Sequence, residues 1–385
     1  MRLRRITLQN FRNIAFADIR LEGRLQFLVG GNGQGKTSFL EAAGFVSALR
    51  SFRATESRVL IRQGQAEAAL ACEFGHEHLG DTRLLIKLRT DGKEVWCDGE
   101  RVPRVSEHLG RFPTVVFSSQ DQQLIRGAPA LRRRWLDLTL AMTDAAYLSA
   151  LQAYHQALAG RNSLLKRQAP ARELAAFEHP LATAAAGLVR KRQASVAELA
   201  EHVTRAYAQI ADHAEPTSLT LSAHTAGTEA GDTATPDPDP APSPALSARD
   251  AAAWLAVFER HRTRDLQMRA TLTGPHRDDL VFKVGGRPAR DFGSEGQQRS
   301  LALALRLAQV EFFRARSGIE PVLLADDVLG ELDPARRRRF WTSLGDTRQV
   351  IATGTTLPDT APGDWQVLHV ASGAFSGSPP SPPFV

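Results

Sequence analysis

The residues best placed to do chemistry form a glycine-rich loop that ends in a lysine and a hydroxyl. The loop follows the pattern G-x-x-x-x-G-K-[ST], in which backbone N–H groups cradle phosphate oxygens. Lys36 would reach the outer phosphates, and Thr37 would place its hydroxyl on Mg²⁺. The predicted phosphate-binding residues are Gly30, Gly31, Asn32, Gly33, Gln34, Gly35, Lys36, Thr37 and Ser38. The alternative is a glycine-rich turn with a chance Lys-Thr.

The elements around this loop favour phosphate binding over a chance turn. The apolar run Leu25–Val29 predicts a buried strand, and residues 39–43 begin a helix. A helix N-terminus behind such a loop adds a favourable dipole for an anion. Upstream, Arg12 is either a solvated charge at a strand end or a cation beside the phosphates.

A second set of acidic residues follows an apolar strand at 321–327. Asp326 would hold Mg²⁺, directly or through water, and Asp327 would orient or deprotonate the attacking water. The alternative is an acidic strand-to-loop turn. Just beyond, Asp333 before Pro334 predicts a helix N-cap.

A serine-glycine turn at 292–300 precedes an amphipathic helix. Ser294 is either a helix cap, with Gln297 completing a capping box, or an anion-binding group at a helix N-terminus. The order of the motifs along the chain is the one found in ABC-type ATPases: the phosphate loop comes first, followed by S-x-G-Q-Q, the acidic pair and E-L-D. In those proteins the serine-glycine element of one subunit closes over the γ-phosphate held by another.

Length and patterning predict a protein of two or three domains. Residues 3–29 read as two strands with a turn at 18–23, and residues 83–118 read as β structure with hairpin signals at Asp91-Gly92 and Asp98-Gly99. Apolar spacing predicts one long helix over 131–165. Further helices are predicted over 174–210, interrupted by Pro180, and over 249–272. The proline-rich segment 224–247 predicts a disordered or extended linker.

Composition narrows the class of protein without naming a partner. The net charge of +6 and the pI of about 9.7 permit nucleic acid as a partner. Two cysteines, Cys72 and Cys97, favour a reduced, cytoplasmic protein. We expect no signal peptide, membrane span or membrane partner, because no long apolar run occurs.

The combined motifs resemble the RecF family of bacterial recombination-mediator ATPases, relatives of the SMC-type ATPases. The most specific element is Thr273–Leu280, which reads Thr-Gly-Pro-His-Arg-Asp-Asp-Leu. Other matching residues are 8–13, 30–38, 116–118, 127–129, 132–134, 161–166, 294–298 and 322–333.

The resemblance implies an α/β ABC-type, SMC-like P-loop ATPase head formed by both chain ends, with an inserted α-helical arm. The expected boundaries are 1–120 and 273–385 for the head and 121–272 for the arm. It implies ATP and Mg²⁺ as cofactors, Lys36, Asp326, Asp327 and Ser294 as catalytic residues, and Arg12 beside the nucleotide.

The same resemblance implies a weak, switch-like ATPase that dimerises on ATP and clamps DNA. The expected DNA is gapped or has a junction between single and double strands. The implied partners are RecR and RecO, which help RecA load on single-stranded gaps in replication, recombination, repair and the SOS response. Two departures from many ABC ATPases fit slow turnover: residues 350–355 lack a histidine, and Asp327 stands where relatives use glutamate.

Four basic runs could contact DNA or could be solvated helix faces: 132–134, 166–167, 190–192 and 336–339. We favour DNA contact for the arm as a whole, through sequence-independent phosphate contacts. His276 either senses nucleotide or anchors its turn, and the structural role is slightly favoured.

Two other functions fit part of the pattern. A P-loop kinase acting on a small molecule or nucleotide would share the phosphate loop but would not need the S-x-G-Q-Q element. A scaffold that binds ATP only for folding would not need Lys36, Asp326 and Asp327 together.

Overall fold

A mixed six-stranded sheet carries the phosphate loop. The computed structural model describes residues 1–54, 56–211, 215–223, 250–327, 333–356 and 364–377. The strand order in this sheet is β15-β14-β3-β13-β12-β8, and only β15 runs antiparallel to its neighbour. Its strands are β3 (Leu25–Val29), β8 (Thr114–Ser118), β12 (Val322–Asp326), β13 (Val350–Gly354), β14 (Gln366–Ala371) and β15 (Ala374–Gly377). The predicted strand over residues 25–29 is confirmed.

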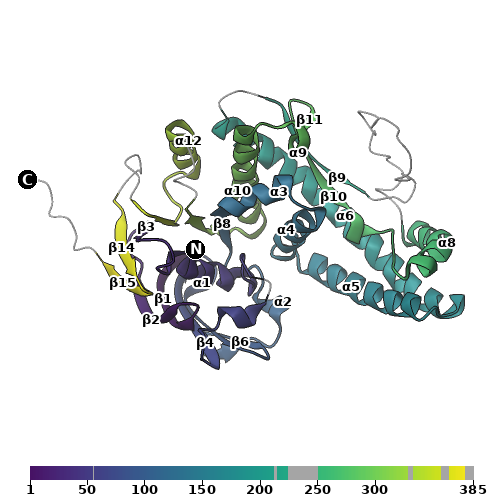
Figure 1. Cartoon of the computed structure of the whole chain (residues 1–385), viewed down its shortest axis with the longest axis horizontal. Coiled ribbons are helices and arrows are strands. Elements are labelled where there is room, and N and C mark those ends of the chain that lie inside the picture. Colours follow the sequence, from purple (N-terminus) through teal and green to yellow (C-terminus); the bar gives the residue numbers. More distant parts are fainter. Residues whose placement is uncertain (55, 212–214, 224–249, 328–332, 357–363, 378–385) are drawn as a thin grey trace, which may run out of the picture. The chain divides into compact units, whose positions relative to one another are not determined.

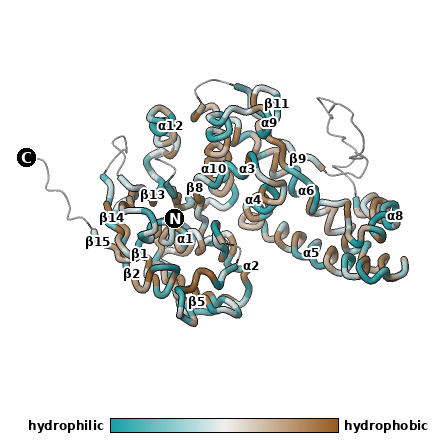
Figure 2. Tube along the Cα trace, in the orientation of Figure 1, coloured by the Kyte–Doolittle hydropathy of each residue, from teal (hydrophilic) through white to brown (hydrophobic). Residues whose placement is uncertain are grey.

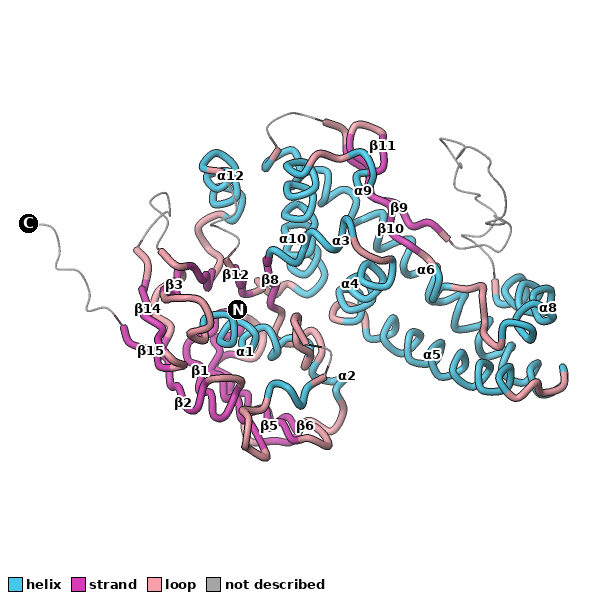
Figure 3. The backbone as a smooth tube through the Cα atoms, in the orientation of Figure 1, coloured by secondary structure: helices cyan, strands magenta, loops and turns pink. Residues whose placement is uncertain are grey.

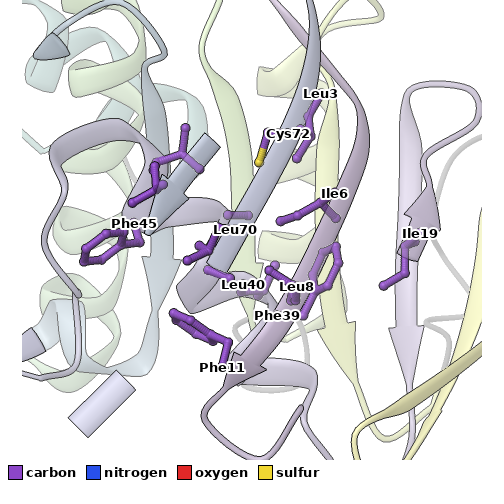
Figure 4. Packing of buried hydrophobic residues seen from close by; sticks show 14 of the residues in the cluster. Leu3, Ile6, Leu8, Phe11, Ile19, Phe39, Leu40, Phe45, Leu70 and Cys72 are labelled. Carbon is purple, nitrogen blue, oxygen red and sulfur yellow. The ribbon is translucent and has the colours of Figure 1, made fainter. Parts of the chain in front are cut away.

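An antiparallel sheet of order β2-β1-β4-β5-β6-β7 forms a second layer. Its strands are β1 (Arg2–Phe11), β2 (Ile14–Arg20), β4 (Glu67–His76), β5 (Gly80–Arg89), β6 (Lys93–Cys97) and β7 (Glu100–Arg101). Alternate residues of β1 and β4, among them Ile6 and Leu70, point toward Phe39 and Leu40 of helix α1 (Lys36–Ala48) (Figure 4). This period-two burial follows from the alternation of side chains along a strand.

The first hairpin differs from its prediction. Residues 2–29 form three strands rather than two, because the chain reverses at Arg12 and Asn13 between β1 and β2. Arg12 takes a left-handed conformation, with φ of 55°, where no glycine or proline signals a turn. The hairpin turns predicted at Asp91-Gly92 and Asp98-Gly99 are confirmed.

Helices α10 (Glu295–Ser317) and α12 (Pro334–Leu344) belong to the same compact unit as these two sheets. Leu301, Leu305, Ala308 and Phe312 are buried, as the amphipathic spacing of α10 predicts. The short helical segments η1 (Ser57–Leu60), α2 (Val105–His108) and η2 (Ser119–Asp121) also belong to this unit, whereas α3 (Gln122–Arg126) lies in the second unit apart from its first residue.

The second compact unit is mainly helical (Figures 1 and 3). Its main helices are α4 (Pro129–Ala141), α5 (Ala145–Lys166), α6 (Ala171–Ile210, whose last turns belong to the first unit) and α8 (Ala251–Met268). A small sheet joins β9 (Thr217–Ser222), β10 (Asp279–Val284) and β11 (Arg287–Pro288), beside η3 (Pro275–Arg277) and α9 (Ala289–Phe292).

Two helix predictions for this unit were wrong. The expected single helix over 131–165 breaks after Ala141, because the Asp144 side chain accepts the Tyr147 N–H and caps a new helix. Conversely, Pro180 does not interrupt α6, which runs for 40 residues. Proline has no backbone N–H, so the helix lacks one hydrogen bond at this position. The buried apolar side chains on both sides of Pro180, including Leu174 and Leu181, keep the helix continuous there.

The two units are Met1–Gln122 with Arg205–Ala214 and Gly296–Val385, and Gln123–Thr204 with Glu215–Glu295. The boundary expected at 273 therefore falls later in the chain. Residues 279–284 group with the helical unit because β10 pairs along its length with β9. The predicted linker at 224–247 lies outside the described residues.

Both cysteines are free, as expected: Cys72 is buried and Cys97 is half-buried. Within the described ranges, no helix is both long and apolar enough to cross a membrane.

Candidate functional site

A cleft of about 810 Å³ opens over the phosphate loop in the first unit. The loop contributes Asn32 to Ser38, and the acidic strand contributes Asp326 and Asp327. The remaining lining residues are Arg12, Asn13, Arg53, Val59, Ile61, Arg62, Gln63 and Thr353. Two motifs that lie far apart in the sequence thus share one cavity.

Glycine is required at two points of the loop. A Cβ on Gly30 would lie 2.3 Å from the Val370 carbonyl oxygen, so β14 leaves no room for a side chain. Gly35 has φ of 120° and precedes α1 with no side-chain cap. The first N–H groups of α1 therefore keep their capacity to bind an anion.

Lys36 lies folded onto its own loop. Its side chain is buried, and Nζ donates hydrogen bonds to the carbonyl oxygens of Gly30 at 2.6 Å and Gly31 at 2.8 Å. Neutral carbonyls hold the ammonium in place without cancelling its charge. The cation therefore remains available to phosphate oxygens in the cleft.

Thr37, Asp326 and Thr353 meet through one carboxylate oxygen. The hydroxyls of Thr37 and Thr353 donate to Asp326 Oδ1 at 2.9 Å and 3.1 Å. Burial raises the pKa of Asp326, and the two hydroxyl hydrogen bonds oppose that rise. A threonine hydroxyl beside a carboxylate supplies the hard oxygen ligands that Mg²⁺ prefers, so the residues fit the expected metal.

Asp327 faces the cleft from a strained backbone position. It is exposed, its φ is 57°, and its N–H donates to Thr353 Oγ1 at 3.1 Å. Left-handed backbone at a non-glycine residue is uncommon and persists where neighbouring groups hold it. Thr353 therefore holds the backbone of Asp327 and the carboxylate of Asp326.

Arg12 lies beside the loop, as predicted, but its charge is already paired. Its guanidinium donates twice to the fully buried Glu41, at 2.8 Å each, and once to the Val59 carbonyl at 2.9 Å. Next to it, Asn13 contacts the loop by accepting from the Ser38 hydroxyl and donating to the Gly33 carbonyl.

The sequence argument missed several residues of this cleft. Asn13 stands inside a motif that was recognised for its neighbour Arg12. Thr353 stands in the segment 350–355, which was considered only for its lack of a histidine. Nothing in the local sequence pattern singles out Arg53, whose charge opposes the rise in the pKa of Asp326.

Ser294 is exposed at the residue before α10, and it is not among the described residues that line the cleft. Its catalytic assignment stays a prediction. Asp333 caps α12 by accepting the Arg336 N–H, as predicted. Its neighbours Glu331 and Leu332 lie outside the described residues.

Two of the predicted basic runs contain buried arginines. Arg132 is 3% exposed and pairs with Asp279 at 2.7 Å, and Arg192 is 2% exposed and pairs with Asp137 and Asp278. These two side chains stabilise the helical unit and do not face solvent. His276 has a structural environment too: its Nε2 donates to the Thr271 carbonyl and its Nδ1 accepts from the Tyr154 hydroxyl.

Similarity to known proteins covers nearly the whole chain. Residues 2–357 match the family profile "RecF/RecN/SMC N terminal domain". A "DNA replication and repair protein RecF" from Geobacter metallireducens is 36% identical over 91% of this chain and 92% of that protein. The protein of the same name from Anaeromyxobacter dehalogenans strain 2CP-C is 37% identical, over 98% of this chain and 99% of its own.

Solved structures show the same fold. A structure described as "the recombination mediator protein RecF-ATP in RecFOR pathway" superimposes with a TM-score of 0.86 at 26% identity, over 98% of this chain and 97% of that one. An Smc head domain from Pyrococcus furiosus, at 18% identity and a TM-score of 0.53, shares the fold alone. The fold is that of an SMC-like ABC-type ATPase head, and the chain belongs to the RecF family of replication and repair proteins.

Proposed function

We propose that this RecF-family protein binds and slowly hydrolyses ATP with Mg²⁺, and that ATP controls its binding to DNA. The observation that carries the proposal is the contact between Thr37 of the phosphate loop and Asp326 of the acidic strand, 289 residues later. A small-molecule kinase would not need the S-x-G-Q-Q element that accompanies these residues, and a scaffold that binds ATP only for folding would not need Lys36, Asp326 and Asp327 together.

The chain's own groups would divide the work as follows. The N–H groups at the start of α1 and the ammonium of Lys36 bind and orient the phosphates. Thr37 and Asp326 hold Mg²⁺, which when bound neutralises charge on the phosphate oxygens. Asp327 positions the water that attacks the γ-phosphate in line, and Thr353 keeps Asp327 in place.

The proposal extends to a dimer and to partners through family resemblance. Ser294 of a second copy would complete the site over the γ-phosphate, so ATP would stabilise the homodimer. A clamp of this kind would bind gapped or junction DNA and act with RecO and RecR to help RecA load on single-stranded gaps. Its place in recombination and the SOS response rests on the same resemblance.

The test is ATP hydrolysis by the purified chain, with and without gapped DNA, over a range of protein concentrations. We expect DNA to raise turnover and specific activity to rise with protein concentration, because the site needs two copies. Turnover that changes neither with DNA nor with protein concentration would contradict the composite site. It would favour a kinase that acts on a small molecule or nucleotide.

A variant of the phosphate loop separates dimerisation that depends on ATP from dimerisation that does not. Lys36→Ala should abolish the ATP-dependent dimer seen by light scattering. Lys87→Ala is the matched control, because this lysine lies on β5 over the Trp96 ring and away from the cleft. An unchanged dimer fraction for Lys36→Ala with ATP would overturn the proposed role of the loop.

A further inference from the structure

One end of the helical unit gathers three helix termini. Helix α5 ends there at Lys166, α6 begins at Ala171, and α8 ends at Met268. Leu164, Leu165, Ala169 and Leu174 form a buried cluster, against which Leu266 of α8 packs. We call the exposed surface of Lys166–Glu173 and Arg264–Arg269 the basic end surface.

The polar groups beneath this surface balance one another. Arg161 is fully buried and donates to Asp265 at 2.7 Å and to Glu178 at 3.1 Å. Arg262 also binds Glu178. Two cations thus face two carboxylates, so the interior leaves no negative charge to neutralise the surface. Such a network also fixes α5, α6 and α8 relative to one another.

The surface itself carries a strong positive excess. Lys166, Arg172, Arg264 and Arg269 are exposed, and within the described part of the chain none of the four makes an ion pair. The fifth cation, Arg167, pairs with Glu173, the exposed acid of these segments. The polar residues of α8 lie in its C-terminal half, and Figure 2 shows part of this helix in the hydrophilic colour.

Helix dipoles explain only part of this charge. Lys166 and Arg269 lie at helix C-termini, where a cation is favourable by about 0.3–1 kcal/mol. Arg172 lies in the first turn of α6, where a cation is unfavourable. The excess therefore points to an anionic partner that several of these side chains contact together.

The absence of an aromatic platform favours a duplex over a single strand. Residues 166–173 and 264–269 contain no aromatic residue on which bases could stack. Phe177, one turn farther along α6, is 38% exposed, but its ring packs against Gly160 of α5, where an added Cβ would lie 2.3 Å from it. What remains is a set of long cationic side chains suited to backbone phosphates.

We propose that the basic end surface binds the phosphate backbone of double-stranded DNA through Lys166, Arg172, Arg264 and Arg269. The inference rests on the proposed DNA-binding function and assigns it to a specific surface. These contacts carry no sequence preference, and they set much of the salt dependence of binding.

The experiment measures fluorescence anisotropy of a labelled duplex with the full chain and ATP, from 50 to 300 mM salt. The variant replaces all four side chains with glutamine. The control replaces Arg58, Arg83, Arg89 and Arg101 with glutamine, which removes the same charge from exposed, ion-paired sites in the other unit. Each phosphate contact contributes about 0.9 to the slope of log K against log salt.

We expect the variant to reduce the magnitude of that slope by about three to four units and to bind more weakly at low salt. The control should keep most of the wild-type slope. ATP binding and DNA-independent hydrolysis should match wild type, which shows that the variant folds. Arg172→Glu with Arg264→Glu supplies a second variant, and it should weaken binding further than glutamine at the same two sites.

Equal losses in variant and control, or a wild-type slope in the variant, would overturn this surface as the DNA site. A loss confined to single-stranded DNA of equal length would overturn the duplex assignment. Absence of any salt-dependent DNA binding by the wild-type chain would instead overturn the proposed function, so the two failures are distinguishable.

Discussion

The hydroxyl of Thr353 accepts the backbone N–H of Asp327 at 3.1 Å and donates its own proton to the neighbouring Asp326. One side chain of β13 therefore holds both the carboxylate of Asp326 and the backbone of Asp327. This position adjoins the cleft over the phosphate loop.

Replacing Thr353 with valine keeps the volume and removes both hydrogen bonds. Hydrogen bonds to charged groups are worth about 1.5–3 kcal/mol, so we expect kcat for ATP hydrolysis to fall roughly tenfold to a hundredfold. ATP affinity should change less, since the phosphate loop is untouched. Thr353→Ser should restore turnover in single-turnover assays, whereas wild-type turnover by Thr353→Val would rule out a positioning role.

Asp326→Asn should stabilise the protein without ligand at neutral pH. Burial raises the pKa of Asp326 in the folded state, so the folded state binds its proton more tightly than the unfolded state. Wild-type stability is therefore highest below the unfolded pKa and falls as pH rises through the folded pKa. Asparagine resembles the protonated carboxyl and avoids that loss.

The measurement for Asp326→Asn is the difference in Tm between variant and wild type across pH. It should be positive at pH 7, shrink as pH falls toward about 4, and vanish below that value. The same variant should lose Mg²⁺-dependent ATP binding. A less stable variant at pH 7 would contradict the stated cost of the buried charge.

Arg12→Ala should destabilise the fold as well as disturb the site. Glu41 is fully buried and would keep an unpaired charge, which costs about 3–5 kcal/mol in the free energy of unfolding. Arg12→Gln with Glu41→Gln removes both charges and should recover most of that stability. Chemical denaturation measures the effect, and additive losses in the double variant would show that the pair is not coupled.

His276 should make the helical unit sensitive to acid. Burial lowers the pKa of His276 to about 4, against about 6.5 in the unfolded chain. Between these values the unfolded state binds the extra proton, so stability falls as pH drops from about 6.5 to about 4. The loss is on the order of 3 kcal/mol.

His276→Gln should remove most of that pH dependence, although it lowers stability at pH 7 by disturbing the Tyr154 and Thr271 contacts. His179→Gln, on an exposed face of α6, is the control and should behave as wild type. Urea denaturation at pH 4.5, 5.5 and 7 gives the comparison. Equal pH slopes in wild type and His276→Gln would contradict this account.

Local patterns predicted the parts of the site that depend on neighbouring residues. The strand at 25–29, the helix that begins at Lys36, and the strand that ends at Asp326 were read from short motifs and are present. Thr353 and Glu41 escaped notice because their partners, Asp327 and Arg12, lie elsewhere in the chain. Only the folded structure brings such pairs together.

Runs of charged residues and the spacing of apolar residues were poorer guides to which way a side chain faces and where an element ends. The run at 132–134 predicted cations at the surface. Arg132 nevertheless faces inward, because its guanidinium pairs with Asp279 of β10. Apolar spacing continued smoothly across 142–144, although a single side-chain cap at Asp144 restarts the helix there. Pairing between β9 and β10 moved the domain boundary, because strand pairing depends on residues far away in the sequence.

The order of strands in the phosphate-loop sheet also sets the order of folding during synthesis. Strand β3 leaves the ribosome long before both of its neighbours, β13 and β14, which lie at residues 350–371. The nascent phosphate loop therefore has no sheet to anchor it until residues 350–371 emerge, whereas β9 and β10 of the helical unit are already complete. High sequence separation between paired strands slows folding, so nucleotide binding arises only after residues 350–371 have been made.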